Sequence, residues 1–304
     1  MIDMELKTEI KRFLDTLDRS SRTISTYENA LKQFMYVVGE DADLTPENYS
    51  AFLTAFKSAS PSTKNTYGSA VRKFYKFCKA GHAEEIKEIT SHLVRNQGKR
   101  FVNFNRDAVE KVIEYCSNLS GDLEALRDRA FVLTLVDTGL RISEACTLKR
   151  SDIDWMEGRA IIIGKGDKQA VVRFTSRSLQ AIKEYLTQRA ELDGNSGRQL
   201  SSLPLFARHD KGAGKKVKPM TTTTGRNIVK ERVEQFLGKE MIGKITPHSF
   251  RHYFVTTVLR GTGNLKIAQE LARHKNIQVT QRYTHLSDDE LDKAYYEVFE
   301  KKED

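Results

Sequence analysis

The chain has 304 residues, more than one typical domain, so it can bury more than one hydrophobic core and two domains are expected. Lys and Arg outnumber Asp and Glu by 50 to 41, and the formal net charge of +9 favours polyanionic partners and argues against acidic ones. The charged N-terminus lacks the apolar core of a signal peptide and no run of about 18 apolar residues occurs, so we expect a cytoplasmic protein that makes no membrane contact.

Residues 1 to about 90 show the spacing of four short helices. The clearest covers 21–39, with Ser21 placed to cap it, Gly39 placed to end it, and apolar residues at steps of three or four: Ile24, Tyr27, Leu31, Phe34 and Val38. An earlier helix covers 6–17. Thr45 and Ser60 each place a capping hydroxyl before a proline at the first helical position. A small all-α domain is predicted over 1–90.

The fourth of these helices carries three cations on one face: Lys64, Arg72 and Lys76. Such a row is compatible with an ordinary solvated helix face. Next to a domain that cuts DNA, it is better interpreted as a DNA-binding face.

A polar, basic stretch over 91–103 lacks a clear period and is predicted to be a linker. A mixed α/β domain is predicted over 104–304, mainly helical with a small antiparallel sheet. Its sheet signal is the pair GRAIII and QAVVRF, joined by the turn GKGDK, which predicts a β-hairpin. Helices resume near Ser176, and the loop 209–225 is too rich in Gly and Lys to be packed core.

The cysteines are widely separated and lie in apolar helical patterns: Cys78, Cys116 and Cys146. Buried free thiols are therefore expected, rather than a disulfide or a metal site.

One short motif near the end of the chain predicts an anion site. Thr246 and Pro247 are a capping residue and a helix-starting proline, so His248 lies in the first turn and Arg251 shares its face one turn later. Free backbone N–H groups and the helix dipole favour a phosphate there. By itself, His-x-x-Arg is short enough to recur by chance.

Two further residues follow at fixed spacing. A helix covers LKIAQELA, His274 comes just after it, and Tyr283 stands nine residues later, after a short helical stretch that opens near Asn276. Alone, Tyr283 would more often be a packing residue. Ser287 and Glu290 then form a capping box for a terminal helix with an apolar stripe.

Taken together, TGLRISE, GKG on a hairpin, HSFRH, the later His and the Tyr nine residues beyond it resemble the tyrosine recombinase family of phage integrases and Xer-type recombinases. The motifs span about Thr138 to Leu286, and the N-terminal helices look like that family's core-binding domain. The resemblance departs at one position, where the family usually has glycine before the second His and this chain has Arg273. Arg273 can alter the turn or add a phosphate contact.

The resemblance implies the role of each residue in cutting and rejoining DNA through a 3′-phosphotyrosyl bond. Tyr283 would be the nucleophile, Arg141 and Arg251 the clamp on the phosphate, and Lys165 the general acid, with Lys168 as the competing lysine. His248 would assist proton transfer from the tyrosine, His274 would hydrogen-bond the phosphate, and Glu144 would orient the site.

The chemistry agrees with those roles. A tyrosine phenol has an ordinary pKa near 10, so at pH 7 it needs a cationic site and a base to attack. Guanidinium groups match phosphate oxygens in pairs and act where charge develops in the transition state. Covalent capture stores the energy of the broken bond, so no cofactor, metal or ATP is implied.

The implied partner is double-stranded DNA, bound by a dimer on one site and a tetramer in synapsis, with accessory DNA-binding proteins as further partners. Two alternatives remain open: a type IB-like topoisomerase that reseals the original strand, and a DNA-binding regulator whose catalytic residues are idle. The terminal helix, with Leu291, Ala294, Tyr295 and Val298 on one side, packs either on its own domain or on a neighbouring protomer.

Overall fold

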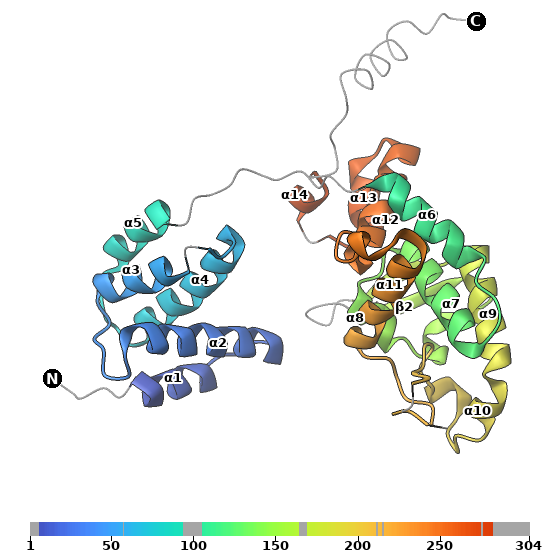
Figure 1. The fold of residues 1–304 in the computed structure, drawn as a ribbon, viewed down its shortest axis with the longest axis horizontal. Helices are drawn as coiled ribbons and strands as arrows, with labels where there is room; N and C mark the ends of the chain where they lie inside the picture. Colours follow the sequence, from blue (N-terminus) through green and yellow to red (C-terminus); the bar gives the residue numbers. More distant parts are fainter. Residues whose placement is uncertain are drawn as a thin grey trace, which may run out of the picture. The chain divides into compact units, whose positions relative to one another are not determined.

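The computed structural model describes residues 6–56, 58–93, 105–163, 169–210, 212–214, 216–274 and 276–281. The chain divides into two compact units between Arg100 and Phe101, and Figure 1 draws both. That division falls inside the predicted linker 91–103. The limits of the linker stay a prediction, because the described part of the chain stops at Leu93 and resumes at Asn105.

The first unit consists of helices in the part that the structure describes. Their bounds are α1 Leu6–Asp15, α2 Ser21–Val38, α3 Pro46–Ala55, α4 Pro61–Phe77 and α5 Ala83–Leu93. Two of the helices begin as their sequences predict. The Thr45 hydroxyl accepts from Asn48 N–H at 3.3 Å and the Ser60 hydroxyl accepts from Thr63 N–H at 3.2 Å, each before a proline at the first position.

Aromatic side chains fill the core of this unit. Phe34 meets Phe52 and Tyr75 edge to face, with ring centroids 5.5 and 5.8 Å apart. Each of these rings is completely buried or nearly so, which stabilises the unit by about 1.5–3 kcal/mol per side chain. The apolar residues of α2 therefore contribute to the core, as their spacing predicts.

The second unit is a helical domain with one small sheet. Its helices are α6 Arg106–Ser117, α7 Leu123–Thr138, α8 Ile142–Thr147, α9 Ser176–Gln188, α10 Ala190–Gly194, α11 Thr222–Leu237, α12 Pro247–Thr262, α13 Leu265–Ala272 and α14 Ile277–Thr280. Short 3₁₀ turns lie at Arg150–Asp152, Leu200–Ser202 and Lys239–Met241. The strands are β1 Ile153–Asp154, β2 Arg159–Ile163 and β3 Gln169–Arg173.

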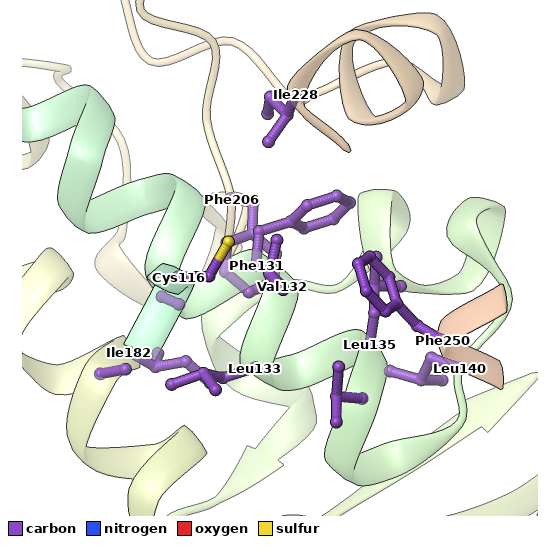
Figure 2. Packing of buried hydrophobic residues seen from close by; sticks show 14 of the residues in the cluster. Cys116, Phe131, Val132, Leu133, Leu135, Leu140, Ile182, Phe206, Ile228 and Phe250 are labelled. Atoms are coloured by element: carbon purple, nitrogen blue, oxygen red, sulfur yellow. The ribbon is translucent and has the colours of Figure 1, made fainter. Parts of the chain in front are cut away.

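Helix α7 is the centre of this domain. Its first half carries charged residues, but every residue from Ala130 to Val136 is buried and all except Thr134 are apolar, as expected of a helical segment that is covered on every side. Figure 2 shows Phe131 and Leu133 of α7 among buried side chains from four other helices and a loop: Cys116, Ile182, Phe206, Ile228 and Phe250. This packing fixes the C-terminal end of α7, where the candidate site begins.

The sheet is antiparallel in the order β1-β2-β3, and Ile161 pairs with Val171 across the predicted hairpin. Along β2, Ala160 and Ile162 are buried against the domain while Ile161 and Ile163 are exposed. The alternation that predicts a half-buried strand is therefore present. The hairpin tip, 164–168, lies outside the described residues.

Three details differ from the sequence prediction. The described part of the first unit holds five helices rather than four, because α5 was not recognised, and the N-cap position of α2 is taken by Ser20 rather than Ser21, without a side-chain capping hydrogen bond. The loop predicted over 209–225 ends earlier, since α11 begins at Thr222, and it is not free of core residues, since Ala213, Val217 and Met220 are buried in it. Within the described ranges, no helix combines the length and apolar character that crossing a membrane requires.

Candidate active site

The site begins where α7 ends. Gly139 takes the left-handed conformation after Thr138, with φ of 59°, Leu140 is buried, and Arg141 precedes α8. Glu144, in the first turn of α8, accepts from the Arg141 backbone N–H at 2.8 Å and from its guanidinium Nη1 at 2.7 Å. Glu144 therefore orients Arg141, whose side chain remains 49% exposed.

Helix α12 supplies the next two groups. Thr246 is the N-cap, its backbone N–H donates to the Ser249 hydroxyl at 3.0 Å, and Pro247 opens the helix. His248 lies exposed in the first turn, whereas Arg251 is only 3% exposed. The predicted start of this helix is confirmed, and it presents the imidazole and the guanidinium from one helical face.

The guanidinium of Arg251 connects two distant segments. It donates to the carbonyl oxygens of Gly139, after α7, and Ala272, at the end of α13. Because arginine carries several donors in a rigid planar fork, these two bonds fix the plane of the group. The turn that bears Arg141 and the segment that bears His274 are thereby held at the same place.

His274 follows α13 and is anchored through both its backbone and its ring. Its N–H donates to the Gln269 carbonyl at 3.0 Å, and its own carbonyl accepts from the Gln269 side chain at 3.0 Å. Its Nδ1 lies 2.9 Å from the Thr280 hydroxyl of α14. The imidazole orientation is therefore set by the elements on both sides of it.

Arg273, which stands where the resemblance expects glycine, adopts the left-handed conformation at φ of 57°. Its guanidinium turns back into the site, 3.2 Å from the Gly139 carbonyl and 3.2 Å from the Glu144 carboxylate. Glu144 is thus shared between Arg141 and Arg273. Burial acts to raise the pKa of Glu144, but its hydrogen bonds from Arg141 and the charge of Arg273 hold that pKa below its ordinary value.

Burial and the neighbouring cations both favour neutral histidines. His248 is exposed at the surface, but the partial burial of its ring, followed by the charges of Arg251 and Arg141, lowers its pKa, and burial with the same arginines and Arg273 lowers the pKa of His274 to about 4. At pH 7 both rings are therefore neutral. A neutral imidazole can accept a proton or donate one hydrogen bond, depending on which nitrogen carries its hydrogen.

Sequence reasoning missed His252, one turn beyond His248. The two rings lie 4.1 Å apart between centroids at an interplanar angle of 68°, and His252 is buried. Burial lowers the pKa of His252 to about 4, with further contributions from His248, Arg251 and His274. The i,i+4 spacing of the two histidines on α12 was the available signal.

The structure brings five of the predicted site residues together from three separate segments: Arg141, Glu144, His248, Arg251 and His274. Tyr283, Lys165 and the competing Lys168 lie outside the described residues. The roles assigned to all of these residues stay predictions.

The predicted DNA-binding row lies on α4 of the first unit. Lys76 is exposed and Lys64 is half-buried. Arg72 is engaged within its own unit, since its Nη1 donates to the Tyr49 hydroxyl at 2.9 Å and the Thr90 hydroxyl at 3.0 Å. Arg72 therefore connects α4 to α3 and α5, which the sequence row alone did not indicate.

Comparisons with known proteins give the same family for both units of the chain. Residues 102–290 match the family model described as Phage integrase family, and residues 10–82 match that of the phage integrase N-terminal SAM-like domain. The tyrosine recombinase XerC of Bacillus pumilus (strain SAFR-032) is 33% identical over 286 residues, which cover 91% of this chain and 90% of that protein. The XerC of Treponema denticola is 30% identical over 290 residues, 92% of this chain and 91% of that protein.

Solved structures share the fold. The Tn1549 transposon integrase, in complex with transposon right end DNA, superposes with a TM-score of 0.73 at 17% identity, covering 98% of this chain and 100% of that chain. The N-terminal helical domain and the mainly helical catalytic domain with its small sheet are therefore the arrangement that the sequence predicts.

Proposed function

Since this chain belongs to the phage integrase family and is a tyrosine-type site-specific DNA recombinase, we propose that Tyr283 is its nucleophile, acting on a phosphodiester held by Arg141 and Arg251. The observation that carries this assignment is the convergence of Arg141, Arg251 and two neutral histidines at one place. It is a cationic site whose neutral imidazoles can exchange protons.

In the proposed step, the phenolic oxygen of Tyr283 forms a bond to phosphorus as the bond from phosphorus to the 5′ oxygen breaks. The phenol proton passes to His248, which is neutral at pH 7 because its pKa is lowered. The 5′ oxygen leaves as a hydroxyl by taking a proton from Lys165. The reverse sequence, with a 5′ hydroxyl from another strand, rejoins the DNA without an external energy source.

The remaining described groups hold the phosphate. The two guanidiniums oppose the charge that accumulates on the non-bridging oxygens, and this stabilises the transition state more than the ground state. His274 would contribute a hydrogen bond from its other ring nitrogen, in the tautomer whose Nδ1 accepts from the Thr280 hydroxyl; the 2.9 Å contact between these two atoms supports that role. Glu144 acts through Arg141, since it holds that guanidinium in place.

The partner is double-stranded DNA. We propose that a dimer occupies one site, that a tetramer forms in synapsis, and that accessory DNA-binding proteins assist. In the first unit, Lys64, Arg72 and Lys76 would contact backbone phosphates. We place the protein in the cytoplasm because it acts on DNA.

The test is covalent capture. Incubation with a nicked DNA duplex that traps the intermediate, followed by denaturing electrophoresis, should give an adduct for the parent protein and none for Tyr283→Phe. Binding should change by no more than a few-fold, because the hydroxyl contributes little to the field around the phosphate. An adduct that persists in the variant would contradict the assignment of Tyr283 as the nucleophile.

The same assay separates the alternatives. A protein that only binds DNA gives no adduct at all. Transfer of the captured strand to a second duplex distinguishes a recombinase from an enzyme that only reseals its own strand.

A further inference from the structure

Arg273 occupies a backbone position that disfavours it. Its φ of 57° lies in the left-handed region, where a side chain is strained and glycine is not. An observed outlier of this kind next to a reactive site is grounds for asking what the side chain does there.

The side chain is held inside the protein on several sides. It is 11% exposed, and its Nη atoms donate to the carbonyls of Gly139 at 3.2 Å and Leu271 at 3.3 Å. Its Nε is buried and has no hydrogen-bond partner among the described residues. The guanidinium is therefore not extended into solvent, as an arginine at an ordinary helix end would be.

The contact that matters for chemistry is with Glu144. Its carboxylate lies 2.7 Å from Arg141 through one oxygen and 3.2 Å from Arg273 through the other. Two guanidiniums and one carboxylate sum to a net charge of +1. Without Arg273, the pair of Arg141 and Glu144 would be neutral overall, and the Glu144 charge would oppose the phosphate that Arg141 is proposed to hold.

We propose that Arg273 is a positioning residue that offsets the charge of Glu144, so that Glu144 can orient Arg141 without cancelling its cation. The proposal rests on the proposed function, since it concerns the charge that faces the phosphate. It explains why the strained side chain reaches Glu144 rather than solvent. It also distinguishes two effects of Glu144. Its carboxylate holds Arg141 in place, and its negative charge would by itself oppose the phosphate.

The test compares single-turnover rates of adduct formation with saturating nicked DNA. Arg273→Met removes the cation but keeps an unbranched side chain, so cleavage should slow on the order of tenfold or more, with binding affinity changing less. Adding Glu144→Gln restores the net charge to +1, because Arg141 is then the remaining ion of the three. The double variant Arg273→Met/Glu144→Gln should regain most of the lost rate.

Arg129 provides a matched control. It also pairs with a glutamate, Glu184 at 2.8 Å, and also has a buried Nε without a partner among the described residues, but it lies in the middle of α7. It is nine residues before Thr138, where α7 ends, which is on the order of 14 Å along the helix axis. Arg129→Met should therefore cleave at close to the parent rate, at a temperature below its thermal transition.

Two outcomes overturn the proposal. If Arg273→Met cleaves within twofold of the parent, the cation has no role in the reaction. If the double variant is no faster than Arg273→Met, Arg273 is a mechanical tie to Gly139 and Leu271 and not a charge offset. Failure of the proposed function has a different signature, the absence of a Tyr283-dependent adduct in the parent protein.

Discussion

At the scale of single residues, the carbonyl of Gly139 is where the site is assembled. It accepts hydrogen bonds from both Arg251, in α12, and Arg273, the residue that follows α13. Gly139 also has Phe254 packed against the position that a Cβ would occupy, so a side chain there would overlap the phenyl ring. Both its conformation and its surroundings therefore require glycine.

We expect Gly139→Ala to lower stability by about 2–5 kcal/mol, the sum of left-handed strain and overpacking against Phe254. It should also reduce cleavage, since Arg141 follows two residues later. Gly263 is the matched control: it ends α12 in the same conformation, at φ of 62°, with no atom within 4 Å of the position that a Cβ would take. Gly263→Ala should cost only about 1 kcal/mol, measured by denaturant unfolding. Equal losses in the two variants would contradict the packing argument.

A second residue, His209, makes stability depend on pH. The Tyr185 hydroxyl accepts from Arg189 at 3.0 Å and from the Ala207 N–H at 3.2 Å, so its own hydrogen is donated to His209 Nε2, 2.8 Å away. A protonated His209 could not accept that bond. Burial, with the charges of Arg127 and Arg189 outweighing that of Asp210, lowers its pKa to about 4.

The sign of the pH dependence follows from that lowered pKa. Between pH 6.5 and 4 the unfolded chain binds the proton more readily than the folded one, so this contribution to stability is complete above pH 6.5 and is lost as the pH falls towards 4. The slope for one histidine is at most about 1.4 kcal/mol per pH unit. His209→Gln keeps an acceptor and does not titrate, so its thermal transition should fall less steeply over this range. Parallel curves for parent and variant would exclude His209 as the source.

At the scale of elements, local signals account for most of the fold. The prolines after Thr45, Ser60 and Thr246 open helices as predicted, and the hairpin lies at Arg159–Ile163 and Gln169–Arg173. Helix α5 was missed because its apolar positions are few and it runs into the polar stretch. The burial of Ala213 and Val217 was missed because burial in a Gly- and Lys-rich loop depends on distant segments.

The hairpin allows one prediction about the general acid. Lys165→Ala should slow cleavage of an ordinary substrate far more than one with a 5′-bridging sulfur, because a thiolate leaves without needing a proton. Lys168→Ala, the matched change on the same tip, should show no selective rescue. Rates of adduct formation on the two substrates measure this, and rescue of Lys168→Ala instead would reverse the assignment of the two lysines.

At the scale of the whole molecule, the site consists of parts that lie far apart in sequence. Motif order singled out Arg141, Arg251 and His274, and the structure brings these three residues together. It could not indicate that Arg251 would bind the carbonyls of Gly139 and Ala272, or that Arg273 would share Glu144. The contacts of Arg251 with Gly139 and of Arg273 with Glu144 each join residues more than one hundred positions apart, and the contact with Ala272 joins two different elements. Contacts between distant segments leave no periodic pattern in the local sequence from which they could be predicted.

Truncating the terminal segment tests how protomers assemble on DNA. If the apolar stripe of the terminal segment docks on a neighbouring protomer, truncation after Glu290 should leave monomer stability and half-site binding nearly unchanged. Cooperative occupancy of paired half-sites and strand exchange should fall, because the contact between protomers is lost. Thermal melting and gel-shift titrations on single and paired half-sites measure these. A large loss of stability with unchanged cooperativity would favour packing within one chain.

The native thiols have a practical consequence for observing the two units; Cys116 and Cys146 are buried as predicted, whereas Cys78 is half-buried. Burial raises the pKa of Cys78 to about 11 and those of Cys116 and Cys146 to about 12, so at neutral pH hardly any thiolate is present to react with a maleimide. The native cysteines should therefore contribute little to maleimide labelling. Cysteines introduced at Tyr36 and Met156, 86% and 96% exposed in different units, would accept a donor and an acceptor dye. Energy transfer between the dyes, with and without DNA, would report whether the units close around the duplex.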